Sequence, residues 1–470
     1  MVDGPSRLQS IFVAVLAGCT APPTPSETTT PSEWTTLAER IPFEAGATFP
    51  ATPPLELGGG AKVGVKASDC GGCHRENYAE WQGSTHAHAM RDPQFFAEIS
   101  KPGAPRWLCL NCHAPNQNQR AVLIRPQTRL VNSAIDVSQI ERIPNPSFDP
   151  EMRSEGVTCA TCHVRVDGGR SVVVASSRSG RAPHPVIARP QRLQNICLRC
   201  HDPGPGVITP NFLCWFESER ERRAAGVKQT CVDCHMPPVT RSLVGASPPR
   251  ATRKHFWTGG GVPKTFEAYD DLLERAYVPG GQLTAKLTGP QLTVTLRNDK
   301  AGHHLTSGDP ERYVGVEVVV EDARGGQRVL DRRRLGQQWD WGSTDPIRLA
   351  RRVADTRLPA GKARSWSLEL PPETVRIHVR AAHVRLSPAN ARHMKVTEIP
   401  PEVKEMAPEA TAHLPQLEEH YPLMTWFAEE VYSKTAGRWE STPLEDLLKR
   451  SKAQRGQPLE AYPSFEDDPE

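Results

Sequence analysis

One five-residue pattern, Cys-x-x-Cys-His, occurs five times in the 470 residues: CGGCH, CLNCH, CATCH, CLRCH and CVDCH. The residues concerned are Cys70, Cys73 and His74, Cys109, Cys112 and His113, Cys159, Cys162 and His163, Cys197, Cys200 and His201, and Cys231, Cys234 and His235. Two thiols at this spacing can form thioethers with the vinyl groups of one haem, and the adjacent histidine can ligate the iron. Zinc ribbons and disulfides are the alternatives, but neither requires a histidine after each second cysteine. The pattern therefore predicts five covalently bound c-type haems with iron.

Each motif histidine leaves one axial position of the iron to be filled. Outside the motifs, the region of the five motifs has only four further histidines, His86, His88, His184 and His255. Because five haems exceed four spare histidines, at least one ligand has to come from elsewhere or be missing. His303 and His304, in the phrase NDKAGHHLTSGDPERY, lie in a predicted turn between strands that could reach the haem region. A solvated or hydrogen-bonded imidazole remains the alternative for each of them.

The first 61 residues are expected to lie outside the folded body. Residues 1–19 contain a short apolar run that ends in LAGC, which is typical of a bacterial lipoprotein signal with Cys19 as the lipid anchor. An ordinary cleaved signal peptide is the alternative, and both export the chain. Residues 20–61 begin with a Thr/Pro/Ser tract that predicts a linker. A lipid would hold the protein on a membrane surface without spanning it, and no run of 18 apolar residues is present.

The remaining sequence divides into three parts. Residues 62–262 hold the motifs among loops without long periodic segments, so we expect a multihaem cytochrome c domain, mostly α and loop, whose core is largely the haems. Residues 283–388 alternate apolar and polar positions in LTAKLT, LTVTLRN, VGVEVVVED, SWSLEL and VRIHVRAAHV, which predicts an all-β, sandwich-like domain. Residues 400–470 contain ATAHLPQLEEHY, LMTWFAEEVYSK and TPLEDLLKRSK, which predict a helical C-terminal segment.

Several phrases resemble the multihaem cytochromes c of the cytochrome c-554 type: CGGCHRENYAEWQGSTHAHAM, EGVTCATCH, TCVDCHMPP, KHFWTGG and AGHHLTSGDPERY. The resemblance covers about residues 66–320. It implies bis-histidine ligation of most haems and electron transfer between haems in the periplasm or at the outer envelope. By the matching phrases, His86, His255 and His303 look like distal ligands, while His184 depends on local context. No CxxCK motif is present, which argues against the pentahaem nitrite reductases with a lysine-ligated catalytic haem.

Charge and the last cysteine add little to the functional prediction. The formal net charge of +3 does not indicate a nucleic-acid surface, because the propionates of five haems would make the holo-protein slightly negative. Arg-rich stretches such as RPQTR and RSGRAPH are candidates to pair with those propionates. Cys214 is interpreted as a buried structural thiol, with a redox or ligand role as the alternative.

Two functional classes follow. The first is an electron carrier at the bacterial cell envelope that exchanges electrons with redox partner proteins, other cytochromes or a respiratory complex. The second is an enzyme that reduces or oxidises a small nitrogen or sulfur compound at one five-coordinate haem, for which the positions served by His184 and His303 are the doubtful ones. A role as a subunit that only forwards electrons or binds a partner is a third possibility.

Overall fold

The computed structural model describes residues 49–465, except 102–103, 105, 126–129, 132–133, 136–140, 178–181, 203–206, 210–211, 215, 246, 276, 345–346 and 349. The predicted signal peptide, Cys19 and most of the predicted linker lie outside these residues. Of the helices within them, none is long and apolar enough to cross a membrane.

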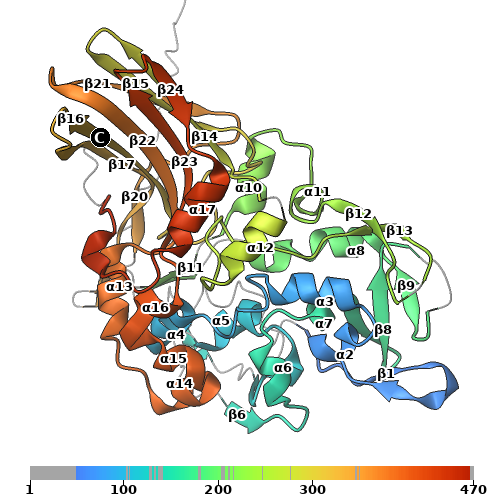
Figure 1. The fold of residues 1–470 in the computed structure, drawn as a ribbon. Coiled ribbons are helices and arrows are strands. Elements are labelled where there is room, and N and C mark those ends of the chain that lie inside the picture. The colour runs from blue at the N-terminus through green and yellow to red at the C-terminus, as the bar shows by residue number, and fades with distance from the viewer. Residues whose placement is uncertain are drawn as a thin grey trace, which may run out of the picture.

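The motif region, as residues 49–274 are called from here on, consists of short helices and small sheets joined by loops (Figure 1). Its helices have at most eight residues: α2 Ala67–Gly71, α3 Arg75–Gln82, α4 Pro93–Ser100, α5 Arg106–His113, α6 Pro150–Ser154, α7 Cys159–His163, α8 Pro190–Asn195, α9 Leu198–His201, α10 Ser218–Ala224, α11 Cys231–His235 and α12 Ala268–Glu274. The small sheets use β1 Leu55–Glu56, β2 Lys62–Val63, β3 Val122–Arg125, β4 Leu130–Val131, β5 Ala134–Ile135, β6 Glu141–Pro144, β7 Val164–Asp167, β8 Arg170–Ala175, β9 Val186–Ala188, β10 Val207–Thr209, β11 Phe212–Cys214, β12 Pro238–Arg241 and β13 Arg250–Arg253.

Two antiparallel sheets follow. The smaller has the order β14-β15-β21 and the larger β20-β17-β16-β22-β23-β24. Their strands are β14 Gly281–Thr288, β15 Gln291–Asn298, β16 Tyr313–Asp322, β17 Gln327–Asp340, β20 Arg351–Asp355, β21 Ala363–Glu369, β22 Thr374–Val384, β23 Met424–Ser433 and β24 Arg438–Ser441, with a small hairpin of β18 Ser343–Thr344 and β19 Ile347–Arg348. All five segments predicted as strands are strands. The inner faces share one core, in which Leu292 and Val294 of the small sheet pack with Val316, Val318 and Val379 of the large one.

The C-terminal part is only partly helical. Its helices are α13 Pro388–Lys395, α14 Pro401–Met406, α15 Pro408–Ala412, α16 Leu417–His420 and α17 Leu444–Lys452. The prediction of a helix over LMTWFAEEVYSK is wrong, because these residues form β23 and pair with β22 in the large sheet. The sequence Met-Thr-Trp-Phe-Ala has aromatic and β-branched residues that suit a strand, and its first positions are buried.

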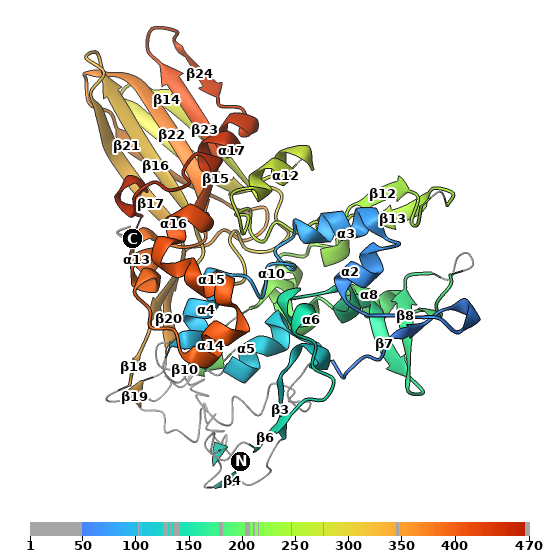
Figure 2. The same cartoon turned by 60° about the horizontal axis from the view of Figure 1, so that its bottom comes forward.

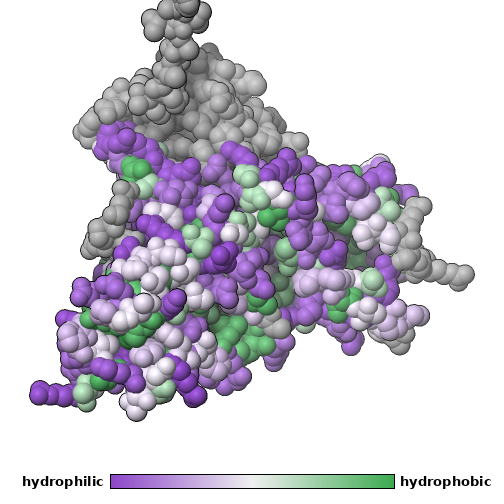
Figure 3. Space-filling view, turned by 90° about the horizontal axis from the view of Figure 1, so that it is seen from above, coloured by the Kyte–Doolittle hydropathy of each residue, from purple (hydrophilic) through white to green (hydrophobic). Residues whose placement is uncertain are grey.

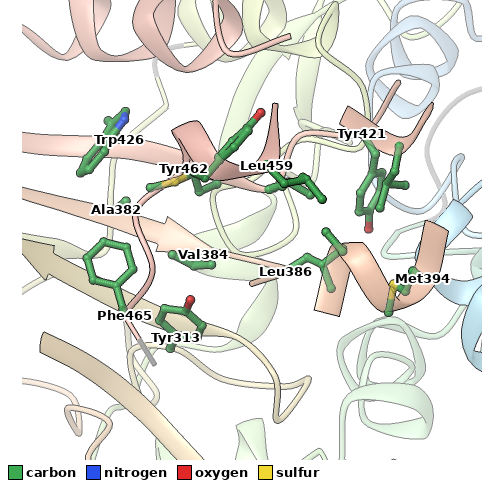
Figure 4. Packing of buried hydrophobic residues seen from close by; sticks show 14 of the residues in the cluster. Tyr313, Ala382, Val384, Leu386, Met394, Tyr421, Trp426, Leu459, Tyr462 and Phe465 are labelled. Carbon is green, nitrogen blue, oxygen red and sulfur yellow. The ribbon is translucent and has the colours of Figure 1, made fainter. Parts of the chain in front are cut away.

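A second core joins the C-terminal segments to the large sheet. Figure 4 shows Tyr313 and Val384 from the sheet together with Leu386, Tyr421 and Phe465 from the segments that follow. A further cluster joins α4 to α14 and α15, and Figure 2 shows these helices side by side. The C-terminal chain therefore lies against both the sheet and the motif region.

Candidate haem-binding site

The motif cysteines lie on short helical turns. The motifs occupy the end of α2 and the residues after it, the end of α5, all of α7, the start and body of α9, and all of α11. Residues three apart in a helix lie on the same face, so the two thiols of each motif can reach one ligand. The histidine at or just after the end of the turn then faces the same space.

All five motifs open into one cavity. It has a volume of about 3090 Å³ and is lined by all ten motif cysteines, the five motif histidines, and His86, His184, His255 and His303. Ordinary small-molecule pockets have volumes of about 300–1,000 Å³. The cavity therefore has room for several large ligands rather than one.

The cavity brings four pairs of histidines together. Each pair joins one motif histidine to one of the predicted distal histidines, with ring centres 6.1–6.5 Å apart: His74–His184, His163–His255, His201–His86 and His235–His303. Metal–nitrogen bonds to histidine are about 2 Å long, and two such bonds plus half of each ring span about 6 Å. Each pair therefore has the spacing that two axial ligands of one iron require.

Backbone carbonyls hold several of these rings by Nδ1. The Nδ1 atoms of His74 and His163 lie 3.2 and 3.0 Å from the carbonyl oxygens of Leu243 and Val174. His303 makes the corresponding contact with the carbonyl of His304 at 2.9 Å. A histidine that donates its Nδ1 proton to a carbonyl presents Nε2 as the metal ligand.

Burial favours the neutral imidazole that a metal needs. It lowers the pKa of His86 to about 3 and the pKa values of His235 and His255 to about 4, and neighbouring histidines add to the effect. A neutral ring has its lone pair available for coordination.

The sequence left two choices open, between His86 and His88 and between His303 and His304, and in the structure the two members of each choice lie in different surroundings. His86 faces His201, whereas His88 does not line the cavity and places Nδ1 2.9 Å from the carbonyl of Ser84. His303 lies parallel to His235, with 2° between the ring planes. His304 instead has its Nδ1 3.5 Å from Glu221 and donates its backbone N–H to the same carboxylate. The loop that carries His303 and His304 connects β15 to β16, so the sheets contribute directly to the cavity.

The second motif differs from the other four. His113 stacks on Phe95 at 3.8 Å and places Nδ1 3.2 Å from the carbonyl of Ala89. Among the described residues, no second histidine ring pairs with it. The nearby charges on Asp92, Lys264 and Asp309 act on its pKa, which burial lowers. Among the residues that the structure describes, His113 is therefore the motif histidine without a histidine beside it, whereas His184 and His303 lie beside His74 and His235.

The residues fit haem as the missing group. Thiols of different motifs act on one another's pKa, in the pairs Cys70–Cys159, Cys112–Cys200 and Cys197–Cys231, and the ten motif cysteines are free thiols. No cluster of three or more metal-binding side chains occurs in the described part of the chain. On the cavity wall, Arg312 has a buried Nε without a hydrogen bond, as propionate partners do before the ligand is present. The Arg-rich stretches proposed for this role fall mostly outside the described residues.

A family comparison agrees with this geometry. Residues 69–135, which include the first two motifs, match the family model described as cytochrome c554 and c-prime. The matched part of the chain is therefore similar to the multihaem cytochromes c of that family. The chain is also similar to the crystal structure of a penta-heme cytochrome c552 from Thermochromatium tepidum, with 19% sequence identity and a TM-score of 0.46. That match covers 72% of this chain and 95% of the other. A comparison of the chain with curated proteins found no match.

Sequence reasoning missed how the motifs and distal histidines combine. His86 follows the first motif in the chain but pairs with the histidine of the fourth, and His255 follows the fifth but pairs with that of the third. Chain order carries no signal for these pairings. The sequence also did not predict the contact of Phe95 with His113. The only local signal was the start of a helix, with Asp92 as its cap and Pro93 in its first turn, which places Phe95 on a helix but does not name its partner.

Proposed function

We propose that the chain is a multihaem cytochrome c that binds five haems through its Cys-x-x-Cys-His motifs and transfers electrons between redox partner proteins at the bacterial cell envelope. The observation that carries the proposal is the set of four histidine pairs across a common cavity. A haem iron with two histidine ligands has no free position for a substrate and exchanges electrons without binding one. The four pairs therefore suit a carrier.

The contacts between motifs support transfer along a branched set of sites. Cysteines of the first and third motifs, of the second and fourth, and of the fourth and fifth act on one another's pKa, and helix α2 also contacts α7 as α5 contacts α9. The charge of Cys162 in the third motif also acts on the pKa of Cys197 in the fourth. The fourth site is thus next to three others and is the natural junction.

The proposed location at the cell envelope is supported by the chemistry of haem attachment and by the N-terminal sequence. Covalent attachment of haem to Cys-x-x-Cys-His takes place on exported chains, and the LAGC phrase at Cys19 is typical of a lipoprotein signal. We propose a periplasmic protein, or one held on the outer membrane by a lipid at Cys19. The face in Figure 3 is mostly hydrophilic with hydrophobic residues in small groups, so partner contacts on it would be largely polar.

Haem count and ligation test this proposal. Protein purified from a host that matures cytochromes c should carry five haems, and its ferric spectrum should be about four-fifths low-spin. Cyanide or carbon monoxide should leave those four haems unchanged. Reaction of more than one haem with carbon monoxide would contradict four paired sites.

A second candidate function is haem-dependent reduction or oxidation of a small nitrogen or sulfur compound at the second motif. The observation that favours it is that His113, alone among the five motif histidines, has no histidine partner in the described residues. A haem held there would supply an iron with one free axial position. The spectrum after addition of carbon monoxide tests it, because about one haem in five should bind. If none binds, another residue fills the position and this candidate fails.

Two acidic residues of the cavity wall, Asp309 and Glu311, are candidates for proton delivery in this second function. Asp309 acts on the pKa of His113, and the backbone N–H of Glu311 donates to Asp309 at 3.0 Å. Glu311 also lines the cavity and accepts from the amide of Asn390 at 3.2 Å. Burial and the neighbouring Asp309 raise the pKa of Glu311 to about 8, so its carboxyl group holds a proton at neutral pH. A group of this kind can donate a proton to a bound oxyanion that takes up electrons.

A further inference from the structure

Trp257 contacts two of the proposed distal ligands at once. Its ring centre lies 4.7 Å from that of His86 and 5.7 Å from that of His255, and the second contact is edge-on, with 81° between the planes. Edge-on and tilted contacts at these distances are favourable arrangements of aromatic rings. Trp257 also lines the cavity.

The two imidazoles belong to different sites. His86 pairs with His201 of the fourth motif, whereas His255 pairs with His163 of the third. The indole therefore lies between the distal sides of the third and fourth sites. It also packs against a small cluster that contains Ala87, next to His86, and Cys159 of the third motif packs against the same cluster.

The backbone on both sides of Trp257 is anchored. The N–H of His255 donates to Glu80 at 2.7 Å, and Glu80 in turn accepts two hydrogen bonds from Arg241 at 2.7 and 2.9 Å. The carbonyl of Trp257 accepts from the N–H of Thr85, directly before His86, at 2.9 Å. These bonds fix the segment that carries His255 and Trp257 against the segment that carries His86.

Close packing at Gly259 also fixes the position of these two segments relative to each other. Gly259 has a φ of +55°, and a Cβ there would lie 2.6 Å from the Cγ2 of Thr85. Only glycine allows both this backbone conformation and this approach. The chain thus brings the two ligand segments together and places one aromatic ring between them.

We propose that Trp257 is the link between the third and fourth haem sites: it holds the planes of the His86 and His255 imidazoles and fills the gap that an electron crosses. This inference rests on the proposed function, because it requires haem at both sites. His163 and His255 would hold the haem iron of the third site, and His201 and His86 that of the fourth, so that one electron could pass between the two. A redox partner protein supplies the electron, and the indole is neither oxidised nor protonated.

The experiment compares Trp257→Leu with wild type and with Trp439→Leu as a matched control. Trp439 packs on Tyr432 at 5.3 Å in the sheets and has no contact with a proposed ligand. Haem content is measured first by intact mass, then the low-spin ferric signals by electron paramagnetic resonance, and then the rate of electron equilibration between haems after rapid photoreduction. We expect Trp257→Leu to keep five haems, to shift two low-spin signals and to slow one equilibration phase roughly tenfold. The control should change neither signals nor rates.

The outcomes separate this inference from the proposed function. Wild-type protein without five haems would overturn the function, and the inference with it. Five haems with unchanged signals and rates in Trp257→Leu would overturn the inference alone. If Trp257→Leu loses haem, Trp257→Phe decides: its smaller ring should shift the same two signals, and unchanged signals would overturn the proposal.

Discussion

The sheets and the motif region differ in what fills their interiors. In the sheets, apolar side chains fill the interior themselves, and Leu292, Val294, Val316 and Val318 are completely buried. In the motif region the described apolar clusters around the cysteines are small, as with Leu55, Val65 and their neighbours, and they surround a cavity of about 3090 Å³. The first region carries its own core, whereas the second needs bound groups to complete one.

The largest effect should follow from preventing haem attachment. When the full chain is made in a cytoplasm without cytochrome maturation, the cavity stays unfilled and its walls lose the contacts that would order them. We expect limited proteolysis to cut between Cys109 and Cys234 while strands from Gly281 to Ser433 remain protected. Equal protease resistance along the apo chain would contradict the difference between the two regions.

The second test concerns the loop between β15 and β16, which carries His303 and His304 and lines the cavity. His303→Ala removes the ring opposite His235, so about one haem in five should become high-spin and bind carbon monoxide. His304→Ala is the matched control, because His304 faces Glu221 instead. The absorption spectrum of each variant checks this. An equal change in both variants would mean that the loop acts only through its fold.

A core substitution should affect stability without affecting the haems. Leu292→Ala leaves a cavity in the fully buried core and should lower the free energy of unfolding by about 2–4 kcal/mol. Val353→Ala, at a position 55% exposed, should change it by less than about 0.5 kcal/mol. Denaturant titration followed by circular dichroism measures both, and the haem spectra should match wild type. A shift of the haem spectrum in Leu292→Ala would show that the two interiors are coupled.

The smallest expected effect is a pH dependence confined to the sheets. Burial by itself raises the pKa of Glu429, but hydrogen bonds with His378, Arg450 and Thr442 outweigh it and lower the pKa to about 2. Because the folded-state pKa is below the unfolded value, this carboxylate stabilises the fold above about pH 4.5, and the contribution is lost as the pH falls towards 2.

Glu429→Gln should therefore lower the free energy of unfolding at pH 7 by an amount on the order of 2 kcal/mol, and the difference from wild type should vanish near pH 2. The control Glu440→Gln removes an exposed carboxylate paired with Arg438 and should have little effect at any pH. Thermal unfolding at several pH values gives both curves. A constant difference at all pH values would mean that the charge of Glu429 does not contribute.

The sequence predicted those features that depend on local patterns. The Cys-x-x-Cys-His spacing placed every motif, and the alternation in Leu292–Leu296 and Val314–Val320 predicted buried strands, because these signals span only a few residues. The strand at Met424–Ser433 was predicted as a helix, since its pairing with Thr374–Val384 is a long-range contact that local periodicity does not report.

The site was predictable as a list of residues and not as an arrangement. Counting spare histidines gave His86, His88, His184 and His255 with His303 or His304 as candidates, but which of them pair with a motif histidine depends on how the loops cross. The contact of Trp257 with two ligands has the same origin. A haem would be held by a motif histidine and a distal histidine that are far apart in the sequence, and no local sequence pattern shows which two histidines meet.

The intact mass of the full-length protein from a maturation-competent host tests the central claim most directly. That claim is that covalently attached haems, one for each motif, complete the interior of the motif region. The account predicts a single species whose mass exceeds that of the processed polypeptide by five haems. A colourless protein with the mass of the polypeptide alone, or a stable folded species with fewer than five haems, would contradict it.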